Sequence, residues 1–273
     1  MNAAQSDQAA RFRALHERAG AFVIPNVWDG ASARLMAGLE FEALATSSSA
    51  CAATLGRLDG QVTRAEALAH ARLIVAASPL PVSADLEQGF GDAPEVVAET
   101  IRQAAATGLV GGSIEDASGN DRAPIYDFEL AVERVMAAVE AARGLSFPFT
   151  LTARSENYLH GRSDLDDTVR RLQAFERAGA DVLFAPGLPD LAAVRAVCSA
   201  VSRPVNFMVG IRGRSFSVAE LSAAGVRRIS LSTSLYRAAI TGLCAAAREV
   251  KESGTFGYLE TIMSGKDLAG FLV

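Results

Sequence analysis

The chain has 273 residues and a formal net charge of −5, from 26 basic and 31 acidic side chains. Half of the residues are hydrophobic and 21% are charged, which is typical of a globular protein with a large core. The mildly acidic balance offers no basic surface to a phosphate backbone, so we expect no nucleic-acid partner. The longest stretch without a charged residue, 43–56, is only 14 residues long and carries several hydroxyl groups. We therefore expect no membrane span, and the absence of a signal-peptide core near the N-terminus predicts a cytoplasmic protein.

Eight short apolar runs predict β-strands, at 21–25, 41–47, 81–85, 109–116, 147–154, 181–186, 203–209 and 226–232. Amphipathic segments between these runs predict helices, most clearly at 64–77, 94–108, 128–144 and 165–180. Strands that are apolar on both faces and alternate with helices favour a parallel sheet. Eight such units in about 250 residues predict an α/β fold of the (β/α)₈ TIM-barrel type. A doubly wound open sheet is the alternative.

We interpret the whole chain, 1–273, as a single barrel domain with a C-terminal helical extension from about 235 to 273. The extension includes a helix-like run at 235–254, one helix more than the barrel needs. Such a helix is available for an oligomer contact.

The scattered cysteines and histidines form no recognisable site. Cys51, Cys198 and Cys244 are too far apart for a zinc motif and are odd in number, so each is expected to be a small buried apolar residue. His16 and His70 fall in predicted helices and are expected at the surface.

The working residues of a TIM barrel lie at the carboxyl ends of its strands, and here these ends are polar. They carry Asn26, Trp28, Asp29, Ser47, Ser48, Ser49, Asp85, Glu87, Glu115, Asp116, Arg154, Glu156 and Asn206. Asp29, Asp116 and Glu156 are interpreted as helix caps or solvated loop charges.

Asp85, Glu87 and Glu115 end neighbouring strands, and converging carboxylates repel one another unless a cation neutralises them. Ligands that are all oxygen suit Mg²⁺ or Mn²⁺ better than zinc. Arg154, one strand away, is placed to hold a substrate carboxylate through two hydrogen bonds.

Several of these motifs together resemble one known family. The run Asp85–Gly91 resembles the DxDxGxG-type metal loop of the isocitrate lyase/phosphoenolpyruvate mutase superfamily, with Glu87 in place of the second Asp. Segments 28–33, 47–49, 55–59, 114–116 and 153–154 resemble further motifs of the same superfamily. The resemblance extends from about Phe22 to Ala247.

The resemblance implies a barrel whose last helix is exchanged with a partner subunit, in a homodimer or homotetramer, and a Mg²⁺ site that holds a 2-oxo acid or its enolate. It implies that Asp85 ligates the metal directly and that Asp59, Glu87 and Glu115 complete the shell. Arg154 would bind the carboxylate or oxyanion end of the substrate. Further substrate contacts are expected from Trp28, Asn206 and the region of Ser47, Ser48 and Ser49.

The sequence departs from the superfamily's best-known enzymes in two loops. Residues 117–124 contain no lysine, cysteine or histidine, whereas isocitrate and methylisocitrate lyases carry a KRCGH-type loop there. Residues 184–188 lack both the lyases' glutamate and the histidine of the phosphonate enzymes. Asn120, with its neighbours 121 and 122, is either a substrate contact or part of an ordinary solvent loop.

The leading hypothesis is a Mg²⁺-dependent carbon–carbon lyase or decarboxylase that acts on a small 2-oxo or 2-hydroxy dicarboxylate through a metal-stabilised enolate. Arg154, Asp59, Glu115 and His160 are the candidate catalytic residues, and Tyr158, His160 or a metal-bound water is the candidate proton donor. The alternative is a protein that binds 2-oxo acids such as oxaloacetate or 2-oxoglutarate without turning them over. A phosphonate mutase or hydrolase is a third hypothesis.

Overall fold

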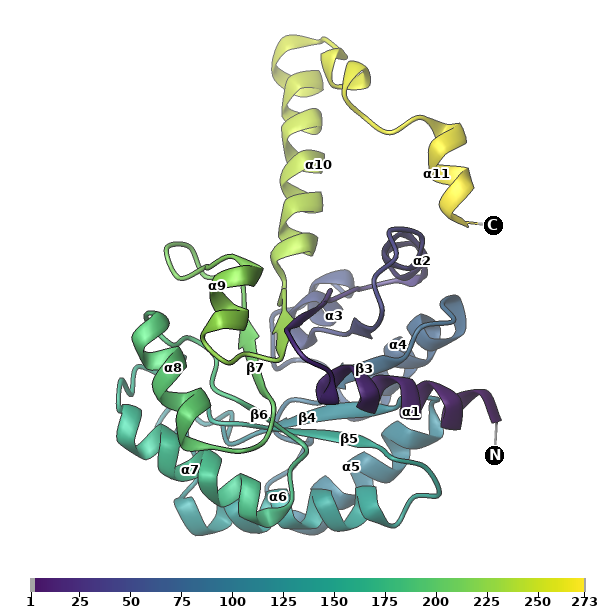
Figure 1. The fold of residues 1–273 in the computed structure, drawn as a ribbon. Helices are drawn as coiled ribbons and strands as arrows, with labels where there is room; N and C mark the ends of the chain where they lie inside the picture. Colours follow the sequence, from purple (N-terminus) through teal and green to yellow (C-terminus); the bar gives the residue numbers. More distant parts are fainter. Residues whose placement is uncertain (1–2, 273) are drawn as a thin grey trace.

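The chain forms a parallel barrel in the computed structural model, which describes residues 3–272 (Figure 1). Neighbouring strands follow the order β1-β8-β7-β6-β5-β4-β3-β2, and every ladder is parallel. A parallel bridge between Asn26 and Ala45 closes the remaining gap between β1 and β2. The strands are β1 (Phe22–Ile24), β2 (Leu44–Ala45), β3 (Val82–Asp85), β4 (Gly111–Glu115), β5 (Thr150–Arg154), β6 (Val182–Phe184), β7 (Val205–Met208) and β8 (Arg228–Ser230). The closed barrel confirms the predicted fold class and rules out the open sheet.

Helices surround the barrel, and the four that the sequence most clearly predicts are all present. The helices up to β8 are α1 (Ala3–Glu17), α2 (Gly30–Gly38), α3 (Ser48–Thr54), α4 (Arg64–Ala77), α5 (Pro94–Ala106), α6 (Phe128–Arg143), α7 (Leu165–Ala178), α8 (Leu191–Ala200) and α9 (Val218–Ala223). Helix α7 ends at Gly179, whose φ of 102° is a left-handed conformation that glycine adopts at little cost. Asp29 caps the start of α2 by accepting the N–H of Ser32 at 2.6 Å, as expected for a helix cap.

Helix α1 closes the amino end of the barrel. Phe12 is completely buried, and its ring lies against Gly111 of β4. A Cβ atom at Gly111 would lie 2.9 Å from the Phe12 ring and 2.9 Å from the Thr150 carbonyl oxygen. Glycine at position 111 therefore leaves room for the Phe12 ring. Because α1 covers the amino end of the barrel, a ligand would enter at the carboxyl end.

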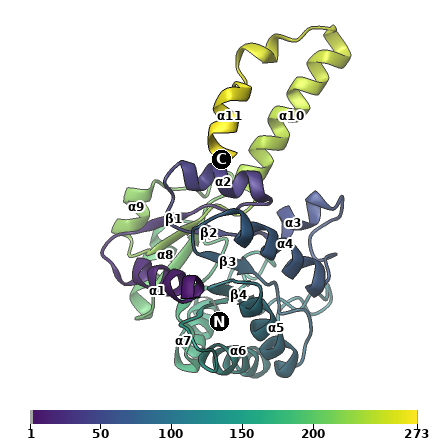
Figure 2. The ribbon, with the colours of Figure 1, turned by 90° about the vertical axis from the view of Figure 1, so that its right-hand side faces the viewer.

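The C-terminal extension forms an arm outside the barrel. Helix α10 (Ser234–Ser253) projects away from the strands, and α11 (Gly265–Leu272) turns back to pack on α2 (Figures 1 and 2). A short 3₁₀ helix, η1 (Gly257–Glu260), lies between them. No residue of α10 is buried, and Leu243 is 64% exposed. This exposed helix agrees with the predicted exchange between subunits, which stays a prediction. No helix among residues 3–272 is long and apolar enough to cross a membrane.

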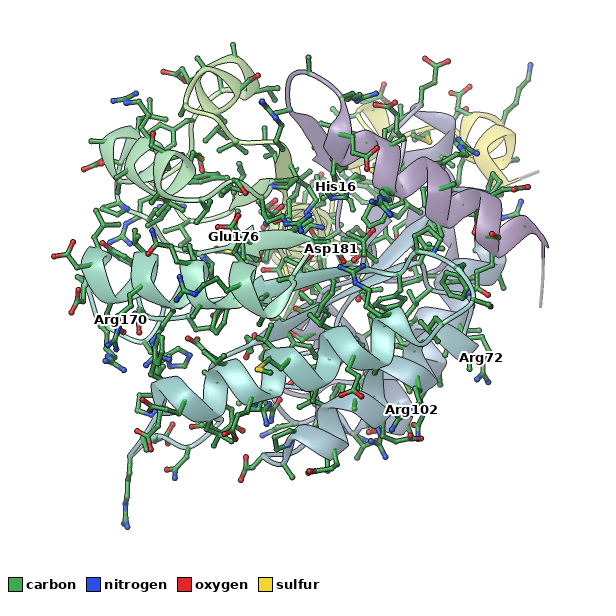
Figure 3. The ribbon with its side chains drawn as sticks, turned by 60° about the horizontal axis from the view of Figure 1, so that its bottom comes forward. His16, Arg72, Arg102, Arg170, Glu176 and Asp181 are labelled. Atoms are coloured by element: carbon green, nitrogen blue, oxygen red, sulfur yellow. The ribbon has the colours of Figure 1, made fainter. Side chains whose placement is uncertain are left out.

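Two surface and core assignments are wrong. His16 is buried because the rings of Phe12 and Phe22 pack edge-on against it, and it borders a small hollow at the amino end of the barrel together with Asp181 (Figure 3). Cys244 is exposed because it lies on the projecting helix α10. Cys51 is buried as expected, whereas Cys198 is only half-buried and His70 is half-buried under the Trp28 carbonyl that it contacts at 2.7 Å.

Candidate active site

Arg154, the last residue of β5, is the centre of a cluster of carboxylates. Its guanidinium donates to Asp85 Oδ1 at 2.8 Å and to Glu156 Oε1 at 2.9 Å, and it lies 3.1 Å from Glu115 Oε2. The ring of Phe184 lies 5.3 Å from the guanidinium carbon. Burial lowers the pKa of Arg154, but Glu156, Glu115 and Asp85 outweigh it and raise the pKa well above its usual value. Arg154 is therefore a permanent, almost fully buried cation at the carboxyl end of the barrel.

The pairing of the strands explains why these side chains meet. Arg154 pairs with Glu115 on β4 and with Phe184 on β6, and Phe184 pairs with Asn206 on β7. Side chains of laterally paired residues in a parallel sheet point to the same face. One row of residues across four strands thus points into the barrel. The predicted convergence of Asp85, Glu115 and Arg154 is confirmed.

The carboxylates around Asp85 share a partly desolvated environment. Burial and the charges of Asp85 and Asp59 raise the pKa of Glu87 to about 7. Burial, followed by the charge of Asp85, also raises the pKa of Asp59, whose carboxylate accepts a hydrogen bond from the Ser48 side chain. Burial raises the pKa of Glu115 well above its usual value in spite of Arg154. Loss of contact with water is the main cause of these shifts, and repulsion between the neighbouring carboxylates adds to it.

Arg134 of α6 holds the loop that follows β3. Its buried guanidinium donates to the carbonyl oxygens of Gln88, Gly91 and Asp92. Within this loop Glu87 has a φ of 49°, a left-handed conformation that is unusual for a residue with a side chain. The three hydrogen bonds stabilise a strained loop that carries a candidate metal ligand.

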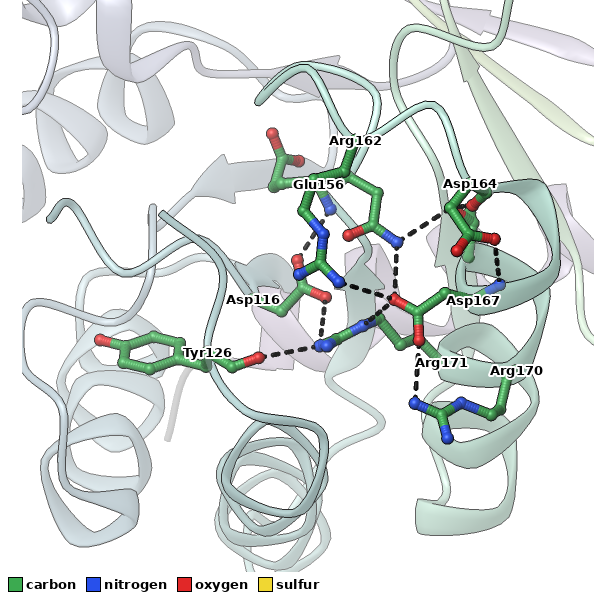
Figure 4. Close-up of polar contacts among 10 residues, drawn as sticks. Asp116, Tyr126, Glu156, Arg162, Asp164, Asp167, Arg170 and Arg171 are labelled. Carbon is green, nitrogen blue, oxygen red and sulfur yellow. Dashed lines mark hydrogen bonds and ion pairs between the residues drawn. The ribbon is translucent and has the colours of Figure 1, made fainter. Parts of the chain in front are cut away.

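A second buried network, made of hydrogen bonds and ion pairs around Asp116 and Arg171, holds the backbone of Glu156 in place (Figure 4). Asp116 accepts the Glu156 N–H at 2.7 Å and lies 3.2 Å from Arg171, which also donates to Asp167 at 2.8 Å and to the Tyr126 carbonyl at 3.0 Å. Burial raises the pKa of Asp116 to about 6. The interpretation of Asp116 and Glu156 as caps or solvated charges is wrong, because both are only 2% exposed and hold the ends of β4 and β5 together.

A cavity of about 70 Å³ opens among the strand ends beside Arg154. Of the residues predicted from the sequence, Asn26, Ser47, Asp85, Arg154 and Asn206 line it. Ser48 is close by, because its backbone N–H donates to Asp85 Oδ2 at 3.1 Å from the first turn of α3. The predicted contact of this segment with substrate oxygens stays a prediction.

Other predicted residues lie farther from the cavity or contact different groups. The ring of Trp28 packs edge-on against Tyr236 of α10 at 5.4 Å, and Ser49 is half-buried on α3. His160 and Asn120 are exposed, and neither lines the cavity. Within residues 3–272, the hydrogen bonds of Asn120 stay in its own turn, where its side chain accepts the Arg122 N–H at 3.0 Å. This geometry favours the solvent-loop interpretation of that segment.

Residues that the sequence did not single out complete the lining. The main ones are Thr46, Ser83, Ser113, Phe184, Arg228 and Ser230. Arg228 lies in the apolar run at 226–232 next to another arginine, and only the register of β8 shows which of the two points inward. Thr46 holds the main chain at Asp85, because its hydroxyl accepts the Asp85 N–H at 3.0 Å.

The donor atoms fit a hard divalent cation. Asp59, Asp85, Glu87 and Glu115 supply oxygen only, and burial, followed by neighbouring charges, raises the pKa of Asp59, Glu87 and Glu115. No three metal-binding side chains within residues 3–272 lie close enough together to form a complete ligand cage. Mg²⁺ is bound by one or two carboxylates together with waters and substrate oxygens, so it does not require such a cage.

Comparison with known proteins agrees with this site. Residues 12–251 match the sequence model of the family described as phosphoenolpyruvate phosphomutase. The oxaloacetate decarboxylase of Paraburkholderia xenovorans is 31% identical over 91% of this chain and 83% of its own. A crystal structure from Burkholderia cenocepacia J2315, described only as that of a lyase or mutase, is 53% identical over 99% of this chain and 97% of its own, with a TM-score of 0.97. The 2,3-dimethylmalate lyase structure is 30% identical over 97% and 95% of the two chains, with a TM-score of 0.87. The chain belongs to the phosphoenolpyruvate phosphomutase family, within the isocitrate lyase/phosphoenolpyruvate mutase superfamily.

Proposed function

We propose that the protein is a Mg²⁺- or Mn²⁺-dependent carbon–carbon lyase or decarboxylase that acts on a small 2-oxo or 2-hydroxy dicarboxylate. The observation that carries the proposal is the buried Arg154, fixed among three carboxylates beside a polar cavity. Relatives that are named as oxaloacetate decarboxylase and 2,3-dimethylmalate lyase support it. Oxaloacetate is accordingly the first substrate to test.

The chemistry follows from charge. Breaking a carbon–carbon bond next to a carbonyl leaves an electron pair that is delocalised as an enolate, so a cationic site lowers the barrier. Arg154 uses three of its five N–H groups on Asp85, Glu115 and Glu156, which leaves donors for a substrate oxygen. Bound Mg²⁺ would supply further Lewis-acid stabilisation of the developing negative charge, and Asp85 is the first residue expected to hold it.

The proton donor is best sought on the loop after β5. Tyr158 is half-buried there, with its pKa raised by burial and then by Asp164 and other nearby carboxylates, so its hydroxyl is protonated at neutral pH. His160 is exposed on the same loop, and neither residue lines the cavity, so either would need a movement of the loop to reach it. Tyr158, His160 and a metal-bound water therefore stay the candidates for the group that returns a proton to the product.

Proton NMR with Mg²⁺ and a panel of 2-oxo acids, malate homologues and citrate homologues tests the proposal. The expected result is consumption of one dicarboxylate with growth of pyruvate or another small acid. Asp85→Ala should reduce turnover about 100-fold or more, because it removes a partner of Arg154 and the first metal ligand. Asp7→Ala is the matched control, since it removes an exposed carboxylate on α1. The hypothesis is falsified if Asp85→Ala leaves metal binding and turnover intact.

One observation favours the non-catalytic alternative. The turn at 118–123 is held by its own hydrogen bonds, from Asn120 N–H to Ser118 and from Arg122 N–H to Asn120, and it offers no lysine, cysteine or histidine. A binding protein would show Mg²⁺-dependent thermal stabilisation by a 2-oxo acid whose concentration stays constant. Consumption of that acid would exclude this alternative. Phosphonate chemistry, the third hypothesis, predicts a change in the phosphorus NMR spectrum of phosphonopyruvate.

A further inference from the structure

The cavity beside Arg154 contains a second buried arginine. Arg228 of β8 is 5% exposed; its Nε donates to Asn206 Oδ1 at 2.9 Å and its Nη2 donates to Thr152 Oγ1 at 3.0 Å. Nothing among residues 3–272 accepts a hydrogen bond from its Nη1, which is also buried. No carboxylate in that part of the chain forms an ion pair with it, whereas Arg154 has three.

The register places Arg228 on the inner wall of the barrel, and the hydrogen bond to Thr152 places its guanidinium deeper than Arg154. Arg228 pairs with Asn206, which belongs to the same inward row as Arg154. Its partner Thr152 lies two residues before Arg154 on β5 and therefore points to the same face. Both arginines line the same cavity, Arg154 near the strand ends and Arg228 deeper in the barrel.

An unneutralised guanidinium in this position is costly. A buried charge without a counter-charge, and a buried donor without an acceptor, each destabilise the folded protein. Burial, followed by the charge of Arg154, lowers the pKa of Arg228 to about 9, so the group is still a cation at neutral pH. The polar groups around it, Asn206 and Ser230, are neutral. An anion that reached this level of the cavity would relieve both penalties.

We propose that Arg228 forms a second anion subsite beneath the metal-binding end of the barrel and takes one carboxylate of the substrate. The subsite rests on the proposed function and deepens it, because it selects dicarboxylates over monocarboxylates. Arg228 lines the same cavity of about 70 Å³ as Asp85 and Arg154. A ligand that places one carboxylate against Arg228 would therefore have the rest of its atoms beside Asp85 and Arg154.

The competing explanation is a structural one. The Nε2 atom of His16 is buried and unpartnered like Nη1 of Arg228, and the charge of Arg228 contributes to the low pKa of His16. If hydration between these two groups is all that Arg228 requires, replacing the arginine would alter stability but would not change the preference for dianions. The experiment is designed to separate these two cases.

The probes are malonate and its monomethyl ester, which have similar shapes but differ by one negative charge. Isothermal titration with Mg²⁺ should show that the wild-type protein binds malonate at least about tenfold more tightly than the monoester, as expected for one charge-assisted contact. Arg228→Gln should weaken malonate binding by a similar factor and change monoester binding less than about twofold. Arg227→Gln is the matched control, because this neighbouring arginine precedes Arg228 and points to the opposite face of the strand; it should leave both affinities unchanged.

Equal wild-type affinities for malonate and the monoester would overturn the proposal without reference to any variant, so it remains testable even if Arg228→Gln does not fold. Equal weakening of both ligands by Arg228→Gln would also overturn it and assign a structural role. Neither probe needs to react, so the titration is independent of turnover. A protein that prefers malonate through Arg228 but consumes no acid in the NMR panel would refute the lyase and retain the subsite.

Discussion

The carboxylate of Asp116 accepts the backbone N–H of Glu156 at 2.7 Å, and this bond joins the loops that leave β4 and β5. Glu156 in turn accepts a hydrogen bond from Arg154 at 2.9 Å. The position of the Arg154 guanidinium therefore depends on Asp116, which does not line the cavity. Asp116 is a positioning residue.

Asp116→Asn tests this dependence. The amide keeps the size of the side chain but removes its charge, so the Glu156 N–H retains an acceptor while Arg171 loses one of its two carboxylates. We expect turnover to fall about tenfold through kcat, with KM nearly unchanged, because the geometry of Arg154 shifts while its charge remains. Steady-state kinetics measure kcat and KM separately, and a change in KM alone would contradict the positioning role. Asp7→Asn, which removes an exposed charge on α1, is the control.

Arg134→Leu should destabilise the protein and loosen the loop after β3. The substitution leaves the carbonyl oxygens of Gln88, Gly91 and Asp92 without their common donor, and each unsatisfied buried acceptor costs about 1–3 kcal/mol. We expect a loss of about 3–5 kcal/mol in urea unfolding, together with weaker Mg²⁺ binding by titration calorimetry. Arg102→Leu, which removes an exposed partner of Glu99, should change stability by less than about 0.5 kcal/mol. Unaltered metal affinity in a folded Arg134→Leu protein would show that the loop holds its shape unaided.

The sequence could predict some of the inward-facing residues of the barrel and missed others. Asp85, Glu115 and Arg154 each end a recognisable apolar run, and the carboxyl ends of parallel strands must converge, so their meeting followed from pattern alone. The inward position of Arg228 could not be predicted, because the run at 226–232 contains two adjacent arginines. A shift of one residue in register would point the other arginine inward instead. The burial of Asp116 could not be predicted for a different reason. Its partner Arg171 lies 55 positions away on α7, and no local pattern connects the two.

Gly111→Ala should disturb the closed end of the barrel. The added methyl group would lie 2.9 Å from both the Phe12 ring and the Thr150 carbonyl oxygen, and neither can move without displacing α1 or β5. Overpacking of this kind costs about 1–3 kcal/mol, which thermal unfolding would detect as a lower Tm. Gly265→Ala is the control, because an added Cβ there meets no atom within 4 Å. A Tm equal to that of the wild type would show that α1 adapts to the extra volume.

His16 should make the stability of the protein depend on pH. Burial, with a smaller contribution from Arg228, lowers the pKa of His16 to about 3, whereas an unfolded histidine titrates near 6.5. Below pH 6.5 the unfolded chain therefore binds a proton that the folded chain excludes, and the free energy of unfolding falls as the pH falls. The loss amounts to about 1.4 kcal/mol per pH unit, or about 2 kcal/mol between pH 6.5 and 5.

His16→Phe should remove this component while keeping an aromatic ring between Phe12 and Phe22. Carboxylates contribute to acid sensitivity in both proteins, so the quantity to compare is the change in unfolding free energy between pH 7 and pH 5, measured in urea. The change should be smaller in His16→Phe than in the wild type by about 2 kcal/mol. His160→Phe, at an exposed position, should behave like the wild type. Identical pH dependence in the wild type and His16→Phe would mean that His16 accepts its proton without unfolding, and α1 would then have to open at acid pH.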